Sequence, residues 1–154
     1  MRTLESKPLF RLALNVAYDR IQDVGQAPAG LRKIFAVDGG TFEGERMRGR
    51  VLPGGADWVL WRGDGAMLID VRLALETDDG AIIAMAYTGI ATSSPEVMAR
   101  FNRREIVPYA EYYVRTTPCF ETSAPRYAWL NSIVTVANGA RTEGGPVYHV
   151  FEIT

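Results

Sequence analysis

Residues 57–88 read DWVLWRGDGAMLIDVRLALETDDGAIIAMAYT, and this stretch decides the fold class. Two turn sequences, Gly63-Asp64-Gly65 and Asp78-Asp79-Gly80, divide it into three apolar runs of strand length. Because Asp-Gly readily adopts the positive φ of tight turns, the stretch predicts two successive hairpins. We therefore expect three antiparallel strands, over Asp57–Arg62, Ala66–Glu76 and Ala81–Thr88.

The rest of the chain repeats this pattern of short strands between turns. Apolar residues alternate with a period of two over Leu9–Tyr18, which is typical of a half-buried strand. Glycine and proline make Gln22–Gly30 a predicted loop. Further strands are expected at Leu31–Val37, Met47–Leu52, Glu111–Thr116, Ala128–Ala137 and Val147–Ile153, with a turn region at Gly139–Pro146 between the last two.

One helix is predicted, at about Pro95–Arg104. Ser94 can cap its amino end, Pro95 suits the first helical position, and Glu96 favours the positive end of the helix dipole. Eight to ten strands with one short helix fit either a closed antiparallel β-barrel or a sandwich. The meander of hairpins favours the all-β barrel, since closure removes exposed sheet edges. We expect a single domain over residues 1–154, with residues 1–8 as an N-terminal extension.

Composition excludes several classes of protein. The 154 residues include 17 Lys+Arg and 18 Asp+Glu, a formal net charge of −1, which argues against binding nucleic acid or anionic membrane through bulk charge. The 47% hydrophobic fraction excludes global disorder. No apolar run approaches the ~20 residues that span a bilayer, residues 1–8 lack a secretory signal's apolar region, and a single Cys119 permits no intrachain disulfide. A cytoplasmic protein is expected.

Motifs for metals, nucleotides and nucleophilic catalysis are absent from the sequence. Thr41 interrupts the glycine spacing of a dinucleotide-binding loop, and Glu45 stands where a phosphate-binding loop needs Lys. One His and one Cys do not supply the ligands of a zinc site. We expect His149 to be partly buried in the barrel wall rather than catalytic, and we predict no metal and no cofactor.

Many charged side chains fall on strands rather than in loops. Asp70, Arg72 and Glu76 share one face of the 66–76 strand, opposite a face of Ile, Val and Leu. Such faces are either solvated, with ion pairs worth ~0–1 kcal/mol each, or they line a wet interior. Aromatic residues of the same parity favour a ligand pocket. Arginine, which outnumbers lysine 15 to 2, binds oxygen anions through paired hydrogen bonds from its planar guanidinium group. The candidate ligand-binding residues are Arg50, Asp57, Trp61, Arg72, Tyr113, Arg115, Trp129 and Asn131, and the candidate acid/base residues are Asp70, Glu76 and Glu121.

Four segments resemble a bacterial and fungal family named domain of unknown function 3237, also called the UPF 0311 group. They are Gly49–Trp58, Leu75–Gly80, Tyr112–Pro118 and Tyr127–Asn131. The resemblance runs from about Phe10 to Ile153. It implies a single-domain β-barrel and no settled activity, so no catalytic role carries over from the family. The family's motif residues here include Arg50, Asp57, Glu76, Arg115, Trp129 and Asn131.

We expect a barrel that binds a small, largely apolar or aromatic molecule carrying an oxygen anion. Arg50, Arg72 or Arg115 would bind the anion, and Trp61, Tyr113 and Trp129 would pack on the apolar body. As an enzyme it would be an isomerase, lyase or cyclase whose acid/base carboxylate is tuned by burial beside Arg. The alternatives are a non-catalytic carrier or sensor and an oligomeric structural module. The modest size of the barrel suggests a homodimer, which light scattering would test.

Overall fold

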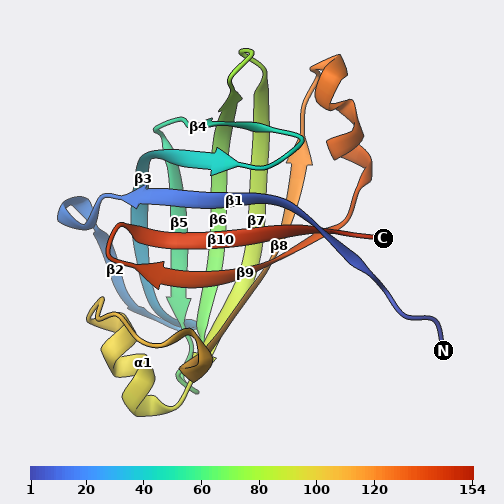
Figure 1. Ribbon diagram of the computed structural model, residues 1–154. Helices are drawn as coiled ribbons and strands as arrows, with labels where there is room; N and C mark the ends of the chain where they lie inside the picture. Colours follow the sequence, from blue (N-terminus) through green and yellow to red (C-terminus); the bar gives the residue numbers. More distant parts are fainter.

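Ten β-strands form one antiparallel sheet that closes into a barrel in the computed structural model, which describes residues 1–154 (Figure 1). Alternation of inward apolar and outward polar side chains builds these strands. The strands are β1 (Ser6–Val16), β2 (Gln22–Ala27), β3 (Gly30–Glu43), β4 (Arg48–Val51), β5 (Gly55–Trp61), β6 (Met67–Thr77), β7 (Ile82–Ser93), β8 (Tyr112–Glu121), β9 (Thr135–Thr142) and β10 (Gly145–Ile153).

Strand β1 closes the barrel, because it pairs with β10 along one edge and with β3 along the other. From β10 the neighbours follow through β9, β8, β7 and β6. The position between β6 and β3 is shared by β4 and β5, each of which pairs with both strands. Eight strand positions therefore close the barrel, β2 is an added edge strand on β3, and the predicted closed antiparallel β-barrel is confirmed.

Glycine permits the close approach of β1 to β3. Gly40 has φ +144°, and a Cβ built there would lie 2.1 Å from the carbonyl oxygen of Ala13. Any larger residue would push the two strands apart where the barrel closes. In Figure 1, β1, β9 and β10 cross in front of β5–β8 as two layers of this closed sheet.

Short helices lie at opposite ends of the barrel (Figure 1). Helix α1 (Pro95–Asn102) begins after Ser94, whose side chain accepts a hydrogen bond from Val97 N at 3.3 Å, close to the predicted helix. At the far end lies η3 (Pro125–Ser132), a 3₁₀ helix; η1 (Tyr18–Arg20) and η2 (Tyr109–Glu111) are single turns. The helices are all too short, or too polar, to cross a membrane.

Three sequence-based expectations about the strands are wrong, and a predicted turn is shorter than expected. Gln22–Gly30 is not a loop, because β2 pairs there with β3. Ala128–Ala137 is not one strand: η3 occupies its first half, where Tyr127 and Leu130 are buried at a spacing of three. β9 continues to Thr142 and β10 begins at Gly145, so the turn lies within the predicted region 139–146 but covers only Glu143 and Gly144. The N-terminal extension is shorter than eight residues, because β1 begins at Ser6.

The η3 half of the barrel is filled with apolar side chains. Leu12, Phe42, Leu75 and Ile83 are each no more than 1% exposed and belong to a single core cluster. Phe10 packs edge-on against Phe42, with ring centroids 5.6 Å apart. A barrel of about eight strands has just enough interior for side chains to fill, so this half leaves no room for a ligand.

Candidate functional site

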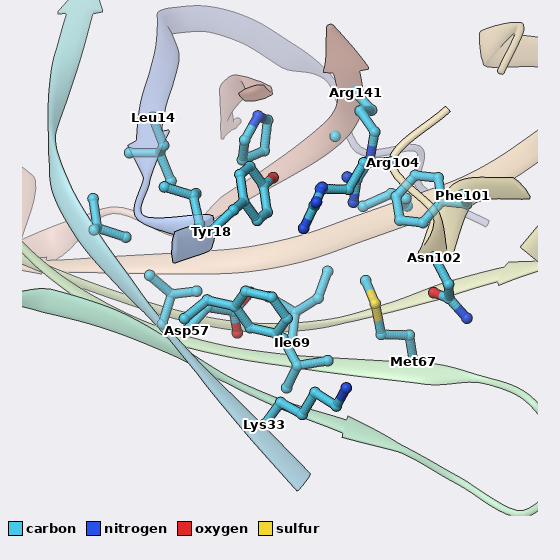
Figure 2. Close-up of a pocket in the computed structure, with 18 of the residues that line it drawn as sticks. Leu14, Tyr18, Lys33, Asp57, Met67, Ile69, Phe101, Asn102, Arg104 and Arg141 are labelled. Atoms are coloured by element: carbon cyan, nitrogen blue, oxygen red, sulfur yellow. The ribbon is translucent and has the colours of Figure 1, made fainter. Parts of the chain in front are cut away.

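A cavity of about 500 Å³ occupies the other half of the barrel, towards α1. Of its 24 lining residues, 17 are hydrophobic. The lining comes from eight of the strands, from the segment around η1 and from the end of α1. Ligand sites of this size are typically apolar with a few polar groups. Figure 2 shows the polar groups that enter it, among them Asp57, Lys33, Arg104 and Arg141.

Asp57 is the only carboxylate that lines the cavity. It lies on β5 in the same inward face as Val59 and Trp61, which also line the cavity. Burial in these apolar surroundings raises its pKa from 3.8 to about 7, and the hydrogen bond from Asp70 N opposes that rise. A carboxyl group with this pKa exchanges protons readily near neutral pH.

The backbone around Asp57 explains how its side chain is held. Strands β5 and β6 pair at Asp57–Val71 and again at Leu60–Leu68, and the residues between these two pairs do not pair across the strands. In that gap one carboxylate oxygen of Asp57 accepts a hydrogen bond from Asp70 N at 3.1 Å. The carbonyl of Trp58 instead accepts from Arg32 Nη1 at 2.7 Å. The interrupted ladder therefore fixes Asp57 and leaves its other oxygen for the cavity.

Two buried tyrosines contribute phenol groups beside Asp57. Tyr87 on β7 and Tyr148 on β10 are 3% and 7% exposed, and their ring centroids lie 5.2 Å apart. Burial raises the pKa of both phenols, and the negative charge of Asp57 raises them further. The Tyr87 hydroxyl lies close to the Tyr148 hydroxyl but makes no hydrogen bond of good geometry. Both phenols are therefore protonated, and each can donate a hydrogen bond into the cavity.

The end of α1 forms the rim of the cavity. Trp61 Nε1 donates to Asn102 Oδ1 at 3.1 Å, which ties β5 to the helix end. Arg104 and Arg141 lie against aromatic rings, with guanidinium carbons 4.5 Å from Tyr18 and 4.3 Å from Phe101 respectively. Lys33, on the wall, is 3.6 Å from Asp23. With Asp57 neutral or charged, the cavity is cationic at its rim.

Comparison with known proteins places this barrel in a family. The family model described as "Protein of unknown function (DUF3237)" matches residues 4–153. The chain belongs to the DUF3237 family. A UPF0311 protein of Rhodopseudomonas palustris is 33% identical over 151 residues, 98% of this chain and 97% of that one. A UPF0311 protein of Clostridium acetobutylicum is 31% identical over 143 residues, 92% and 90% of the two chains.

Solved structures share the DUF3237 barrel. The crystal structure of the Rhodopseudomonas palustris protein, described as a conserved protein of unknown function, has a TM-score of 0.94 at 32% identity and covers all of both chains. A beta-barrel like protein of Acinetobacter baumannii has a TM-score of 0.86 at 34% identity, covering 100% of this chain and 98% of that one. A structure described as an enzyme from Penicillium herquei has a TM-score of 0.74 at 20% identity, over 100% and 97% of the chains, and shows the fold alone.

Only two of the predicted site residues of this DUF3237 protein, Asp57 and Trp61, line the cavity. Asp70 and Arg72 are exposed on the outer face of β6, where they line a small hollow together with Trp58. Glu76 forms an ion pair with Arg50, 2.8 Å from Nη2, also on the outside. These side chains face out because the apolar residues that alternate with them fill the interior.

The remaining predicted residues of the DUF3237 chain also lie away from the cavity. Arg115 stacks on Tyr113, which is 49% exposed, with its guanidinium carbon 4.5 Å from the ring centroid. Trp129 lies at the η3 end, where the guanidinium carbon of Arg46 is 3.5 Å from its ring centroid. Asn131 binds the backbone of Thr122 through both its amide oxygen and its amide nitrogen, each at 2.9 Å. Glu121 is exposed at the end of β8.

Sequence reasoning missed the two tyrosines and the three cations, Lys33, Arg104 and Arg141, of the DUF3237 cavity. Tyr87 has the strand parity of buried Ile83 and Met85, a signal of inward orientation that the sequence contains. Arg141 falls in the segment predicted as a turn. His149 is exposed, so the expectation of a partly buried histidine is wrong. No cluster of three or more His, Cys, Asp or Glu side chains is arranged to hold a metal ion.

Proposed function

We propose that the protein binds a small apolar or aromatic oxygenated metabolite in the cavity and transforms it by acid–base chemistry at Asp57. The observation that carries this proposal is a single carboxyl group with a pKa of about 7 in an otherwise apolar cavity. A general base is most effective when its pKa lies near the working pH. The reaction class is isomerisation, cyclisation, hydration or elimination.

Asp57 and Tyr87 have complementary roles in this proposal. The ionised Asp57 oxygen takes a proton from a carbon next to a carbonyl group, and the electron pair moves onto the carbonyl oxygen. The Tyr87 hydroxyl, buried and without a hydrogen bond of good geometry, donates a hydrogen bond to that developing oxyanion. Return of the proton from Asp57 to another atom of the same molecule completes an isomerisation without a net change in composition.

The Penicillium herquei structure is described as an enzyme. It is a fold-level analogy for catalysis in a barrel of this kind and carries no residue role. A non-catalytic carrier would use the same apolar cavity but would have no need of a carboxyl group poised to exchange protons. The tuned pKa of Asp57 is the observation that favours the enzyme.

Hydrogen exchange at carbon tests the proposal without knowledge of the natural substrate. α-Tetralone, a bicyclic aromatic ketone, is incubated with the protein in D₂O at pH 7.5, and loss of its α-proton signal is followed by NMR. We expect catalysed exchange that falls by about 10²-fold or more in Asp57→Asn and by a smaller factor in Tyr87→Phe.

Asp70→Asn is the matched control, because Asp70 neighbours the same backbone gap but points outward. It should retain exchange within a few-fold of the unmodified protein. Exchange that is equal in Asp57→Asn and the unmodified protein would contradict the role of Asp57. A rise in thermal midpoint with the ketone, but no exchange, would favour the carrier.

A further inference from the structure

Arg104 and Arg141 at the rim of the cavity have charges that nothing in the chain neutralises. Neither belongs to any of the ten ion pairs of the structure. Arg141 Nε is buried and has no hydrogen-bond partner. A buried donor without a partner costs free energy, so a group outside the chain is expected to satisfy it.

The arginines that surround α1 show that this lack of partners is local. Arg100 and Arg103 both bind Glu105, at 3.1 Å and 2.8 Å. Arg104, between Arg103 and Glu105, has a left-handed backbone with φ 62°, the only non-glycine residue with positive φ. This conformation turns Arg104 away from the carboxylate that its neighbour uses and into the cavity, where it lies over Tyr18.

The Arg141 side chain is held in place by the same end of α1. Its guanidinium carbon lies 4.3 Å from the ring centroid of Phe101, three residues before Arg104. Its backbone N donates to the Tyr112 hydroxyl at 3.2 Å, and Tyr112 packs on Phe101 with centroids 5.3 Å apart. Figure 2 shows Arg104 and Arg141 entering the cavity near Phe101, away from Asp57.

We propose that Arg104 and Arg141 form an anion clamp that binds the carboxylate of an aromatic acid, whose ring system extends into the cavity towards Asp57. Guanidinium groups match the planar carboxylate through paired hydrogen bonds, and the aromatic rings beneath them hold their orientation. This inference rests on the proposed function, because it assigns the part of the substrate that does not react.

The strand geometry separates the clamp from Asp57. Asp57 and Trp61 are four residues apart on β5, a rise of about 13 Å, and Trp61 is hydrogen-bonded to Asn102 beside the clamp. A carboxylate at the clamp and a reacting group near Asp57 can therefore belong to opposite ends of one elongated aromatic molecule. Lys33 is partly offset by Asp23, so the clamp is the main source of uncompensated positive charge.

Isothermal titration calorimetry at pH 7.5 with 6-hydroxy-2-naphthoic acid and its neutral amide, 6-hydroxy-2-naphthamide, tests the clamp. The unmodified protein should bind the acid at least about tenfold more tightly than the amide. Arg104→Gln and Arg141→Gln should each reduce the affinity for the acid by about tenfold. The affinity for the amide should stay within about twofold of that of the unmodified protein. Arg103→Gln, an exposed neighbour paired with Glu105, is the control and should change neither.

The clamp would be overturned by equal affinity for the acid and the amide, or by the absence of acid binding at millimolar concentration. It would also be overturned if the double variant Arg104→Gln, Arg141→Gln kept the affinity of the unmodified protein for the acid. Tighter binding of 2-naphthyl phosphate than of the acid would overturn the assignment to a carboxylate. Asp57→Asn should keep the difference between acid and amide. Failure of the acid–base proposal, measured by deuterium exchange, is thereby distinguished from failure of the clamp.

Discussion

The two halves of the barrel are built from the same strands and yet differ in every property that matters for function. Towards η3, β6 and β7 present Leu75 and Ile83, which are completely buried in the apolar core. Towards α1, the same strands present Ile69 and Tyr87 to a cavity of about 500 Å³. The filled half holds the barrel closed, and the hollow half holds polar groups in fixed positions at the boundary of that core.

Truncation of one inward residue in each half should give the largest effect on stability. Leu75→Ala should reduce the free energy of unfolding by about 4 kcal/mol, because it leaves a cavity among tightly packed neighbours. Ile69→Ala, six residues earlier on β6, should cost about half as much, because one side of Ile69 already faces open space. Urea unfolding measures both, and equal losses would mean that the two halves are packed alike.

Stability as a function of pH tests the polar boundary of the hollow half. Because folding raises the pKa of Asp57 from 3.8 to about 7, the folded chain keeps a proton that the unfolded chain loses as pH rises above about 4. The stabilising contribution of this group is therefore fully present below about pH 4 and is lost as pH rises to about 7. Above that pH the free energy of unfolding no longer changes through this group. Asp57→Asn should remove this slope and raise stability at pH 8 by up to about 4 kcal/mol.

Asp64 provides the matched control for that experiment. It is exposed, and its hydrogen bond with Arg62 lowers the pKa of its carboxyl group. Asp64→Asn should therefore act with the opposite sign, removing stability above pH 4 rather than adding it. A pH dependence that is the same in Asp57→Asn and the unmodified protein would show that Asp57 titrates at its ordinary value.

Gly139→Ala should disturb the hollow half alone. A Cβ at Gly139 would lie 2.6 Å from Val114 Cγ1 and 2.9 Å from Tyr148 Cε1, so one of these side chains must shift. We expect a loss of about 1–2 kcal/mol in urea unfolding and weaker binding of 6-hydroxy-2-naphthoic acid. Gly63→Ala, with no atom within 4 Å, is the control, and a similar effect of the two substitutions would contradict this account.

The smallest effect is expected on the outer face. Glu76→Gln breaks the ion pair with Arg50, whose side chain is 67% exposed, and should cost no more than about 1 kcal/mol. Calorimetry should show unchanged affinity for 6-hydroxy-2-naphthoic acid, because neither residue lines the cavity. Loss of that affinity would return the outer face to consideration as a ligand site.

The sequence predicted the barrel because inward apolar residues alternate with polar ones, as on β6, and because Asp-Gly turns separate the strands. It did not predict β2, whose backbone pairs with β3 while its side chains are mostly exposed. Backbone pairing of that kind leaves no pattern in the side chains. In η3, Tyr127 and Trp129 are two residues apart, which is the spacing of residues on one face of a strand. The buried residues are Tyr127 and Leu130, three apart, which is the spacing of a 3₁₀ helix.

The candidate site was predictable only in part, for a related reason. Parity identified Asp57 and Trp61 as sharing a face but could not say which faces of the sheet point inward. That choice depends on which side chains fill the barrel, and the filled η3 half turned Asp70, Arg72 and Glu76 outward. Arg104 enters the cavity through a left-handed backbone at the end of α1, which no period in the sequence indicates.

The most direct test of the account is the titration of Asp57 itself. Carbon-13 NMR of the side-chain carboxyl carbons between pH 3 and 9, with Asp57→Asn for assignment, measures its pKa in the folded protein. A midpoint of about 7 is predicted from its burial at the boundary of the core and the cavity. A midpoint near 4 would contradict the central claim, because Asp57 would then be an ordinary surface-like carboxylate rather than an acid–base group.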